Sequence, residues 1–467
     1  MERFNLKNKI LMGVTLFSMF FGAGNLIFPP FLGAQAGTSG WPALAGFAVS
    51  AVGLPVLGVI AVTLSGGLDQ LASRVHPRFA VLYILILYLA IGPCLAIPRT
   101  ASTSFSMAGL PFWPEEMPAA WLQFAYSLVF FAAAAAVAMH PEKLTEYLGK
   151  KLTPVLLALI VIVFAASCLK EAGPIPAPGE AYASLAPVKG FLYGYQTMDT
   201  LAALNFGMII AMNIRAKGIR QEKAVMRETV SAGWIAGIFL LAVYGMLTFV
   251  GMRGGSAFSD ASDGTGILSG MVGFLFGKGG MVILAVIFVI ACFNTCVGLF
   301  SCCGKYFSGV FPGLSYSRWV LIFAFVSMVI SNVGLEAILN FSQPALNAIY
   351  PLSILLIFLS CTHRWLGRFR AVYPWSAALC GIVSVLTVLD QQGIMLPGAA
   401  ALLHRIPAYA AGFGWLLPSV LGICIGMAVS QVKIKAGVGH NHIGNDPEQS
   451  QSHGQHTQQE HSDERQI

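Results

Sequence analysis

The stretch Phe17-Ser-Met-Phe-Phe-Gly22-Ala-Gly24-Asn25-Leu-Ile-Phe-Pro-Pro-Phe31 interrupts an apolar run that extends over residues 8–33. A helix broken inside lipid leaves backbone N–H and C=O groups that must find partners. Free N–H groups at a half-helix N-terminus favour a carboxylate, whereas free carbonyls favour an ammonium group or a small cation. Close helix packing is the alternative role for a Gly-x-Gly pair. The amide oxygen of Asn25 and the proline pair that follows favour a ligand site.

The composition around this stretch is that of a membrane protein. Charged residues make up 10% of the 467 residues, hydrophobic residues 56%, and the mean hydropathy is +0.73. A water-soluble fold of this length needs more charge on its surface, since roughly 25% is usual. We therefore expect an all-α polytopic protein with membrane lipid as its solvent and no nucleic-acid partner. Hydropathy predicts twelve spans, at 8–33, 41–66, 79–108, 119–138, 151–169, 190–213, 229–251, 267–300, 318–334, 340–361, 373–390 and 409–430.

The 27 Lys and Arg residues predict the orientation of these spans. With twelve spans, 21 of them fall on the side of the termini, and only Arg99, Lys170, Lys189, Arg253, Lys278 and Arg405 fall on the other. Positive residues favour the cytoplasmic side. This pattern predicts a multi-pass protein of the inner (plasma) membrane with both termini in the cytoplasm.

The chain divides into a transmembrane domain over 1–432 and a polar tail over 433–467. The tail is rich in His, Gln and Ser and cannot bury enough apolar surface to fold, so we expect it to be disordered and cytoplasmic. A solvated tail is the simpler interpretation of its histidines, with metal binding as the alternative.

A second polar, glycine-punctuated run opens the sixth predicted span. It reads Gly190-Phe-Leu-Tyr-Gly194-Tyr-Gln-Thr-Met-Asp199. It lies five spans after the first break, and an odd number of spans per half makes the second half enter the membrane from the opposite side. This arrangement predicts an inverted repeat with two discontinuous helices.

Asp199 and Arg99 are the charged residues that could act within the membrane. A carboxylate there usually pairs or faces a cavity, so Asp199 is a candidate proton or cation site, or an outer-gate partner of Arg99. The alternative is that Asp199 caps the following half-helix above the hydrocarbon region. For Arg99, a gate or an ion pair with Asp199 or Glu336 competes with a structural arginine that reaches water at the outer end.

The eighth predicted span contains Cys292-Phe-Asn294-Thr295-Cys296. Asn294 and Thr295 place polar oxygens in mid-membrane, where they could bind a cation opposite the unwound first span. No nucleotide loop, metal-binding helix motif or nucleophilic triad is apparent, so we do not expect an enzyme.

Several segments together resemble one known family. Lys7-Asn8-Lys9, the run from Phe17 to Phe31 and Gly194-Tyr-Gln-Thr-Met-Asp199 are similar to the branched-chain amino acid:cation symporters of the carrier II type. The resemblance covers about 1–432. It implies uptake of leucine, isoleucine and valine with Na⁺ or H⁺ as the coupling ion and no other cofactor. It also implies the five-plus-five inverted-repeat fold of the leucine-transporter superfamily, with helices one and six discontinuous.

The resemblance also implies a candidate cation site between spans one and eight. That fold often has Ser or Thr where Cys296 stands, and sulfur is a poor Na⁺ ligand, so the cation's identity stays open. The candidate ligands are Ser18, Phe21, Asn25, Cys292, Thr295 and Cys296.

We expect alternating access around a site between spans one and six, completed by spans three and eight. Backbone groups at both breaks hold the charged ends of the amino acid, and Phe20, Phe21 and Tyr193 line its side-chain pocket. Other hypotheses are a carrier of another amino acid or a nucleobase, a channel, or a non-transporting sensor. The candidate substrate residues are Phe20, Phe21, Gly22, Ala23, Gly24, Tyr193, Tyr195, Gln196, Thr197 and Asp199, with Arg99 and Asp199 as the candidate gate.

Overall fold

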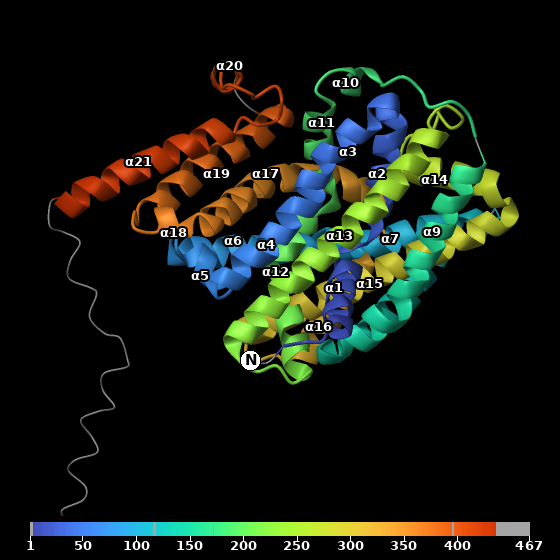
Figure 1. Cartoon of the computed structure of the whole chain (residues 1–467), viewed down its shortest axis with the longest axis horizontal. Helices are drawn as coiled ribbons and strands as arrows, with labels where there is room; N and C mark the ends of the chain where they lie inside the picture. The colour runs from blue at the N-terminus through green and yellow to red at the C-terminus, as the bar shows by residue number, and fades with distance from the viewer. Residues whose placement is uncertain (1–2, 115–117, 171, 395–396, 436–467) are drawn as a thin grey trace, which may run out of the picture.

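The computed structural model describes residues 3–114, 118–170, 172–394 and 397–435, and within these ranges the chain is almost entirely helical with no strand. The longer helices run across the molecule in Figure 1. They are α1 Leu6–Phe20, α2 Ala23–Ala36, α3 Gly40–Ala48, α4 Leu54–Ser65, α6 Pro77–Leu89, α7 Ala96–Ala108, α8 Ala119–Ala138, α9 Thr153–Leu169, α11 Ala186–Gly194, α12 Asp199–Ala216, α13 Glu222–Gly254, α14 Gly264–Phe276, α15 Lys278–Val310, α16 Tyr316–Ser331, α17 Leu335–Cys361, α19 Val372–Gln391 and α21 Leu416–Lys435. The short helices are α5 Leu68–Ser73, α10 Glu180–Ala183, α18 His363–Leu366 and α20 Pro397–Leu403.

These helices confirm an all-α polytopic membrane protein. Among the described residues, 8 helices are long and apolar enough to cross a membrane, or up to 9 if the bent pair α11–α12 counts as one span. Two apolar helices, α14 and α16, fall below that length, as does the stretch Leu416–Val432 of α21. The count of twelve spans therefore stays a prediction. The tail predicted for 433–467 lies outside the described residues, except that α21 continues to Lys435.

The predicted bounds of the eighth span are wrong. The range 267–300 contains two helices, because α14 ends before Gly277 and α15 starts immediately after it. Gly277 has a φ of +59°, in the left-handed region that glycine adopts without a steric penalty. Hydropathy alone does not detect this stop, since both helices are apolar.

The first span is discontinuous at the predicted position. α1 ends at Phe20, Phe21 and Gly22 are extended, and α2 starts at Ala23. The side chain of Asn25 accepts a hydrogen bond of 3.0 Å from the N–H of Gly22, which satisfies one backbone donor at the break. The sequence-based expectation of a broken first helix is confirmed.

The sixth span is discontinuous as well. α11 ends at Gly194, a single 3₁₀ turn follows over Tyr195–Thr197, and α12 starts at Asp199 with its axis bent by 48°. Met198 forms the hinge with a φ of +67°. A non-glycine residue in this region of backbone space is uncommon and is found mostly where the surroundings hold it in place.

A third break was not expected from the sequence. Between α6 and α7 the backbone of Gly92 has φ −93° and ψ −126°, and Pro93 follows it without an N–H to continue the helix. After this break a new helix, α7, begins at Ala96, about one turn before Arg99.

The packing of the broken spans agrees with an inverted repeat. α1 and α2, which form span one, pack against α13 of span seven. α11 and α12, which form span six, pack in the same way against α3 and α4 of span two. α7 of span three packs against α15 of span eight. α17, α19 and α21 gather at one side of the molecule (Figure 1).

Glycines allow the backbones of α3 and α11 to approach each other closely. A β-carbon built on Gly190 would lie 1.9 Å from the carbonyl oxygen of Ala43, and one built on Gly46 would lie 1.8 Å from that of Pro187. Small residues at such crossings are typical of membrane helices.

We expect the substitution Gly190→Ala to destabilise the protein by about 1–3 kcal/mol, because the added methyl group must separate two backbones. Thermal unfolding of the purified protein in detergent measures the effect. The matched control is Gly245→Ala in α13, where a β-carbon meets nothing within 4 Å. Equal unfolding temperatures for the two variants would contradict this account of the α3–α11 contact.

Candidate functional site

The two breaks of spans one and six enclose one central cavity of about 30 Å³. Backbone and side chains from the break of span one form one wall, and the break of span six with the start of α12 forms another. Residues from the segment Ala90–Cys94 between α6 and α7, from α7 and from α15 complete the cavity. A cavity of this size holds one or two water molecules, so an amino acid enters only if the walls move apart. The lining residues are Met19, Phe20, Gly22, Ala23, Gly24, Asn25, Ile91, Ala96, Arg99, Thr100, Thr197, Met198, Asp199, Ala202, Thr295 and Leu299.

Asp199 is the acidic residue of this cavity. It is the first residue of α12 and only 2% exposed. Its Oδ2 accepts hydrogen bonds from Asn25 Nδ2 at 2.6 Å and from the Tyr244 hydroxyl at 2.8 Å, and Asn25 Nδ2 also donates to the Tyr244 oxygen. Within the described ranges Oδ1 accepts no hydrogen bond. The carboxylate is therefore held by neutral donors and the positive end of α12, with one oxygen left for a ligand.

Arg99 is the basic residue of the same cavity. Its side chain is 5% exposed, and its Nη1 donates to the carbonyl oxygen of Gln196 at 3.2 Å. Its Cζ lies 6.0 Å from the ring centroid of Phe28. Arg99 thus lies inside the helix bundle with little of its side chain exposed, unlike an arginine that extends to water.

The hydroxyl of Thr295 borders the cavity without a hydrogen-bond partner in the described part of the chain. It lies against the first break, since a β-carbon on Gly22 would be 2.6 Å from Thr295 Oγ1. Both polar side-chain atoms of the neighbouring Asn294 are also buried and have no hydrogen-bond partner among the described residues. Buried polar atoms without partners are rare in native structures, so these oxygens are candidates for a cation or water.

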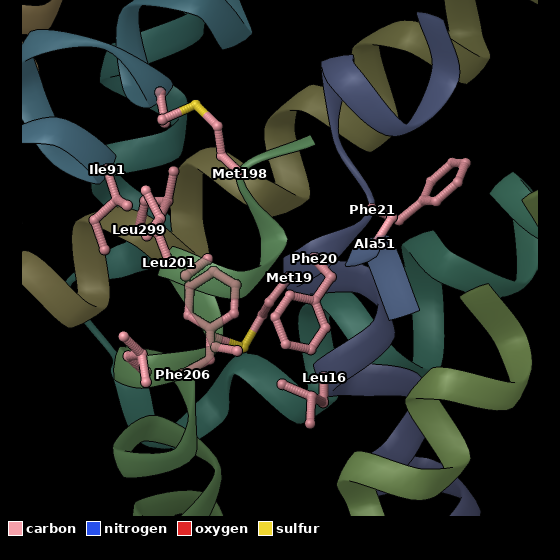
Figure 2. Packing of buried hydrophobic residues seen from close by; sticks show 14 of the residues in the cluster. Leu16, Met19, Phe20, Phe21, Ala51, Ile91, Met198, Leu201, Phe206 and Leu299 are labelled. Carbon is pink, nitrogen blue, oxygen red and sulfur yellow. The ribbon is translucent and has the colours of Figure 1, made fainter. Parts of the chain in front are cut away.

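Six of the predicted substrate residues line the cavity, namely Phe20, Gly22, Ala23, Gly24, Thr197 and Asp199. The other four do not. Phe21 stacks on Phe17 with ring centroids 5.1 Å apart, and in Figure 2 its side chain points away from the group that includes Met19, Ile91 and Leu299.

The other three, Tyr193, Tyr195 and Gln196, lie near the cavity but do not line it. Tyr193 packs edge-on against Phe28 at 5.2 Å, and Tyr195 stacks on Tyr350 at 4.5 Å. Gln196 offers its backbone oxygen to Arg99.

Some of the predicted cation ligands line the cavity and the others do not. Asn25 and Thr295 line the cavity. Ser18 donates its hydroxyl to the carbonyl oxygen of Thr15 at 2.7 Å, a bond within its own helix. Cys292 and Cys296 are fully buried on α15 but are not part of the cavity wall.

Tyr244 is the residue that sequence reasoning missed. It lies in mid-helix on α13, and no neighbouring polar residue distinguishes it in the sequence. The signal that could have found it is a tyrosine flanked on both sides by apolar residues in the middle of a span, because a buried hydroxyl usually needs a partner. Thr100 and the apolar wall residues Met19, Ile91 and Leu299 were also absent from the predicted site.

A second, larger cavity of about 350 Å³ lies beside the first. Its wall runs from the buried Leu204 and Asn205 to the exposed Asp69, Arg215 and Glu222, so it opens at the end that carries the loops predicted to be cytoplasmic. We call this second cavity the vestibule. Ala202 lines the central cavity and Leu204 lines the vestibule, so on α12 the two cavities lie within one helical turn of each other.

A family model described as branched-chain amino acid transport protein matches residues 5–433. The chain belongs to this family. The finding confirms a transporter family and excludes an enzyme family. The branched-chain amino acid permease BraB of Bacillus subtilis is 38% identical to this transporter, over 91% of the chain and 96% of the relative. The permease BrnQ of Escherichia coli is 38% identical, over 89% and 94%.

Solved structures resemble the fold of this transporter at low sequence identity. A Na⁺-coupled sialic acid symporter is similar with a TM-score of 0.57 at 12% identity, covering 91% of this chain and 90% of that one. A nucleobase-cation-symport-1 family transporter is similar with a TM-score of 0.55 at 11% identity, covering 92% and 93%. Likeness at this level supports the fold alone.

Proposed function

We propose that this protein imports leucine, isoleucine and valine together with Na⁺ or H⁺ by alternating access. The assignment of the substrate rests on the family match over residues 5–433, together with relatives that are 38% identical and are named as branched-chain amino acid permeases. The central cavity suits this substrate class. It has charged groups at the broken helices for the ends of a zwitterion and an apolar wall, including Met19, Ile91 and Leu299, for a branched side chain.

Asp199 supports coupling to a cation. It is a buried carboxylate whose hydrogen-bond donors, Asn25 and Tyr244, are both neutral, and one of its oxygens has no donor in the described ranges. A proton or Na⁺ at this oxygen would neutralise the charge, and the side-chain oxygen of Thr295 lies on the same cavity. Coupling follows if one conformation binds cation and substrate together better than the other does.

The pair of cavities supports alternating access. The vestibule reaches the end predicted to be cytoplasmic, and Leu204 in its wall lies less than one helical turn from Ala202 in the central cavity. Release would require this short partition to open, while entry from outside would require the half-helices α2 and α11 to separate. We place the transporter in the inner membrane with both termini in the cytoplasm, on the distribution of its Lys and Arg residues.

Uptake of labelled leucine by proteoliposomes tests the proposal. We expect accumulation when an inward Na⁺ or H⁺ gradient is imposed, and inhibition by unlabelled isoleucine and valine. A carrier of another solute would show no inhibition by these amino acids, and a channel would show a flux that does not saturate. Absence of leucine uptake under both gradients would contradict the proposal.

A further inference from the structure

We propose that Arg99 binds the α-carboxylate of the transported amino acid, so that the protein requires a free carboxylate in its substrate. This inference rests on the proposed function, because it assigns a ligand group to the cavity in which that function places the amino acid. It gives Arg99 a direct binding role in place of a gate.

The first argument is the burial of an arginine with few acceptors. The side chain is 5% exposed and lines the central cavity. Within the described ranges its one hydrogen bond goes to the neutral carbonyl oxygen of Gln196, and it forms no ion pair. A guanidinium group carries five N–H donors and does not lose its proton in proteins. The negative charge of Asp199 lies in the same cavity and partly offsets that of Arg99, but it does not supply the missing acceptors. An anion in contact with the guanidinium would supply them.

The second argument is that the guanidinium group of Arg99 lies next to the break in span one. A β-carbon built on Gly24 would lie 3.0 Å from Arg99 Nη2, so the guanidinium lies directly against the first turn of α2. The N–H groups of that turn have no partner inside the helix, apart from the N–H of Gly22, which donates to Asn25. The helix end and the guanidinium are both positive, and they face the same cavity. An anion there would satisfy both.

The third argument is the fit of a carboxylate rather than another anion. The two parallel N–H groups of arginine match the two oxygens of a carboxylate. The rest of the cavity wall includes Phe20, Ile91 and Leu299, which are apolar. An anion with a compact apolar body fits this wall better than a phosphate does. Asp199 on the opposite half-helix repels a second negative charge, which favours a zwitterion over a dianion.

The test compares leucine with leucinol, which has a hydroxymethyl group in place of the carboxylate. Both are titrated as competitors of labelled leucine binding to the purified full-length protein. We expect wild-type protein to bind leucine roughly 10–100-fold more tightly than leucinol, the ratio expected for one charge-assisted interaction. In Arg99→Gln we expect the ratio to fall towards one, mainly through weaker leucine binding. Arg99→Lys keeps the charge and should retain part of the preference.

The control is Arg405→Gln, on the loop between α20 and α21, which should keep the wild-type ratio. If Arg99 only gates access, Arg99→Gln will change both ligands equally and leave the ratio unchanged, which would overturn the proposal. A wild-type ratio near one would also overturn it, even if Arg99→Gln does not fold. The proposed function is tested separately, since it fails only if wild-type protein neither binds nor transports leucine.

Discussion

Asp199→Asn is expected to abolish the gradient-driven accumulation of leucine. The substitution keeps the shape of the side chain and the oxygen that accepts from Asn25 and Tyr244, so the helix ends should stay in place. It removes the negative charge that a cation would neutralise. Loss of a hydrogen bond to a charged group amounts to about 1.5–3 kcal/mol, or roughly 10–100-fold in affinity for the coupling ion. Initial rates of labelled leucine uptake at varied Na⁺ and H⁺ concentrations measure the change.

The matched control is Asp390→Asn. Asp390 is also hydrogen-bonded, to His404 and Tyr409, but it lies at the end of α19 away from the central cavity. The Asp390→Asn variant should transport leucine at close to the wild-type rate.

Tyr244→Phe should reduce leucine accumulation to an intermediate level, because it removes one of the two hydrogen-bond donors to the Asp199 carboxylate. Full accumulation by Asp199→Asn would show that the coupling ion binds elsewhere, with Thr295 as the next candidate.

Gly22→Ala is expected to lower stability by about 1–3 kcal/mol, the range for overpacking a buried site. We expect the rate of leucine uptake by the Gly22→Ala variant to fall as well. A β-carbon at this position would lie 2.6 Å from Thr295 Oγ1 and 3.0 Å from Thr295 Cβ. The backbone angles of Gly22 are extended, so the barrier to a side chain is the neighbour on α15 rather than backbone strain.

A double-mutant cycle distinguishes this contact from general damage. In a Thr295→Ala background the same change should be tolerated better, because the nearest atom has been removed. Thermal unfolding of the four proteins gives the coupling directly and does not depend on transport. Identical losses with and without Thr295 would refute the steric explanation.

The broken helices could be predicted because glycine and polar residues stand out in an apolar sequence. Gly22, Gly24 and Asn25 mark the first break, and the run that ends at Asp199 marks the second. Lipid makes such a pattern informative, since an unwound segment within it must have a reason. The third break at Gly92-Pro93 carries a similar signal, a glycine followed by a proline inside an apolar run.

Side-chain direction was harder to predict than the breaks. Phe20 and Phe21 are adjacent and alike in the sequence, yet Phe20 lines the cavity and Phe21 packs on Phe17. The difference depends on where α1 ends, which fixes the direction of each ring. Tyr244 shows the same limit, because its partner Asp199 is 45 positions away and only the packing of α12 on α13 brings them together.

The boundary between α14 and α15 illustrates a different limit. Hydropathy averages over a window, and a single left-handed glycine at 277 does not change that average. Conformational signals of one residue are therefore lost where the flanking helices are both apolar.

A structure of the protein with leucine bound tests the central claim most directly. The claim is that the cavity enclosed by the two broken helices holds the amino acid. We predict leucine between Gly22–Gly24 and Thr197–Asp199, with its carboxylate on Arg99 and the cavity expanded from about 30 Å³. Leucine bound in the vestibule beside Asp69 and Arg215, with the central cavity still closed, would contradict the account.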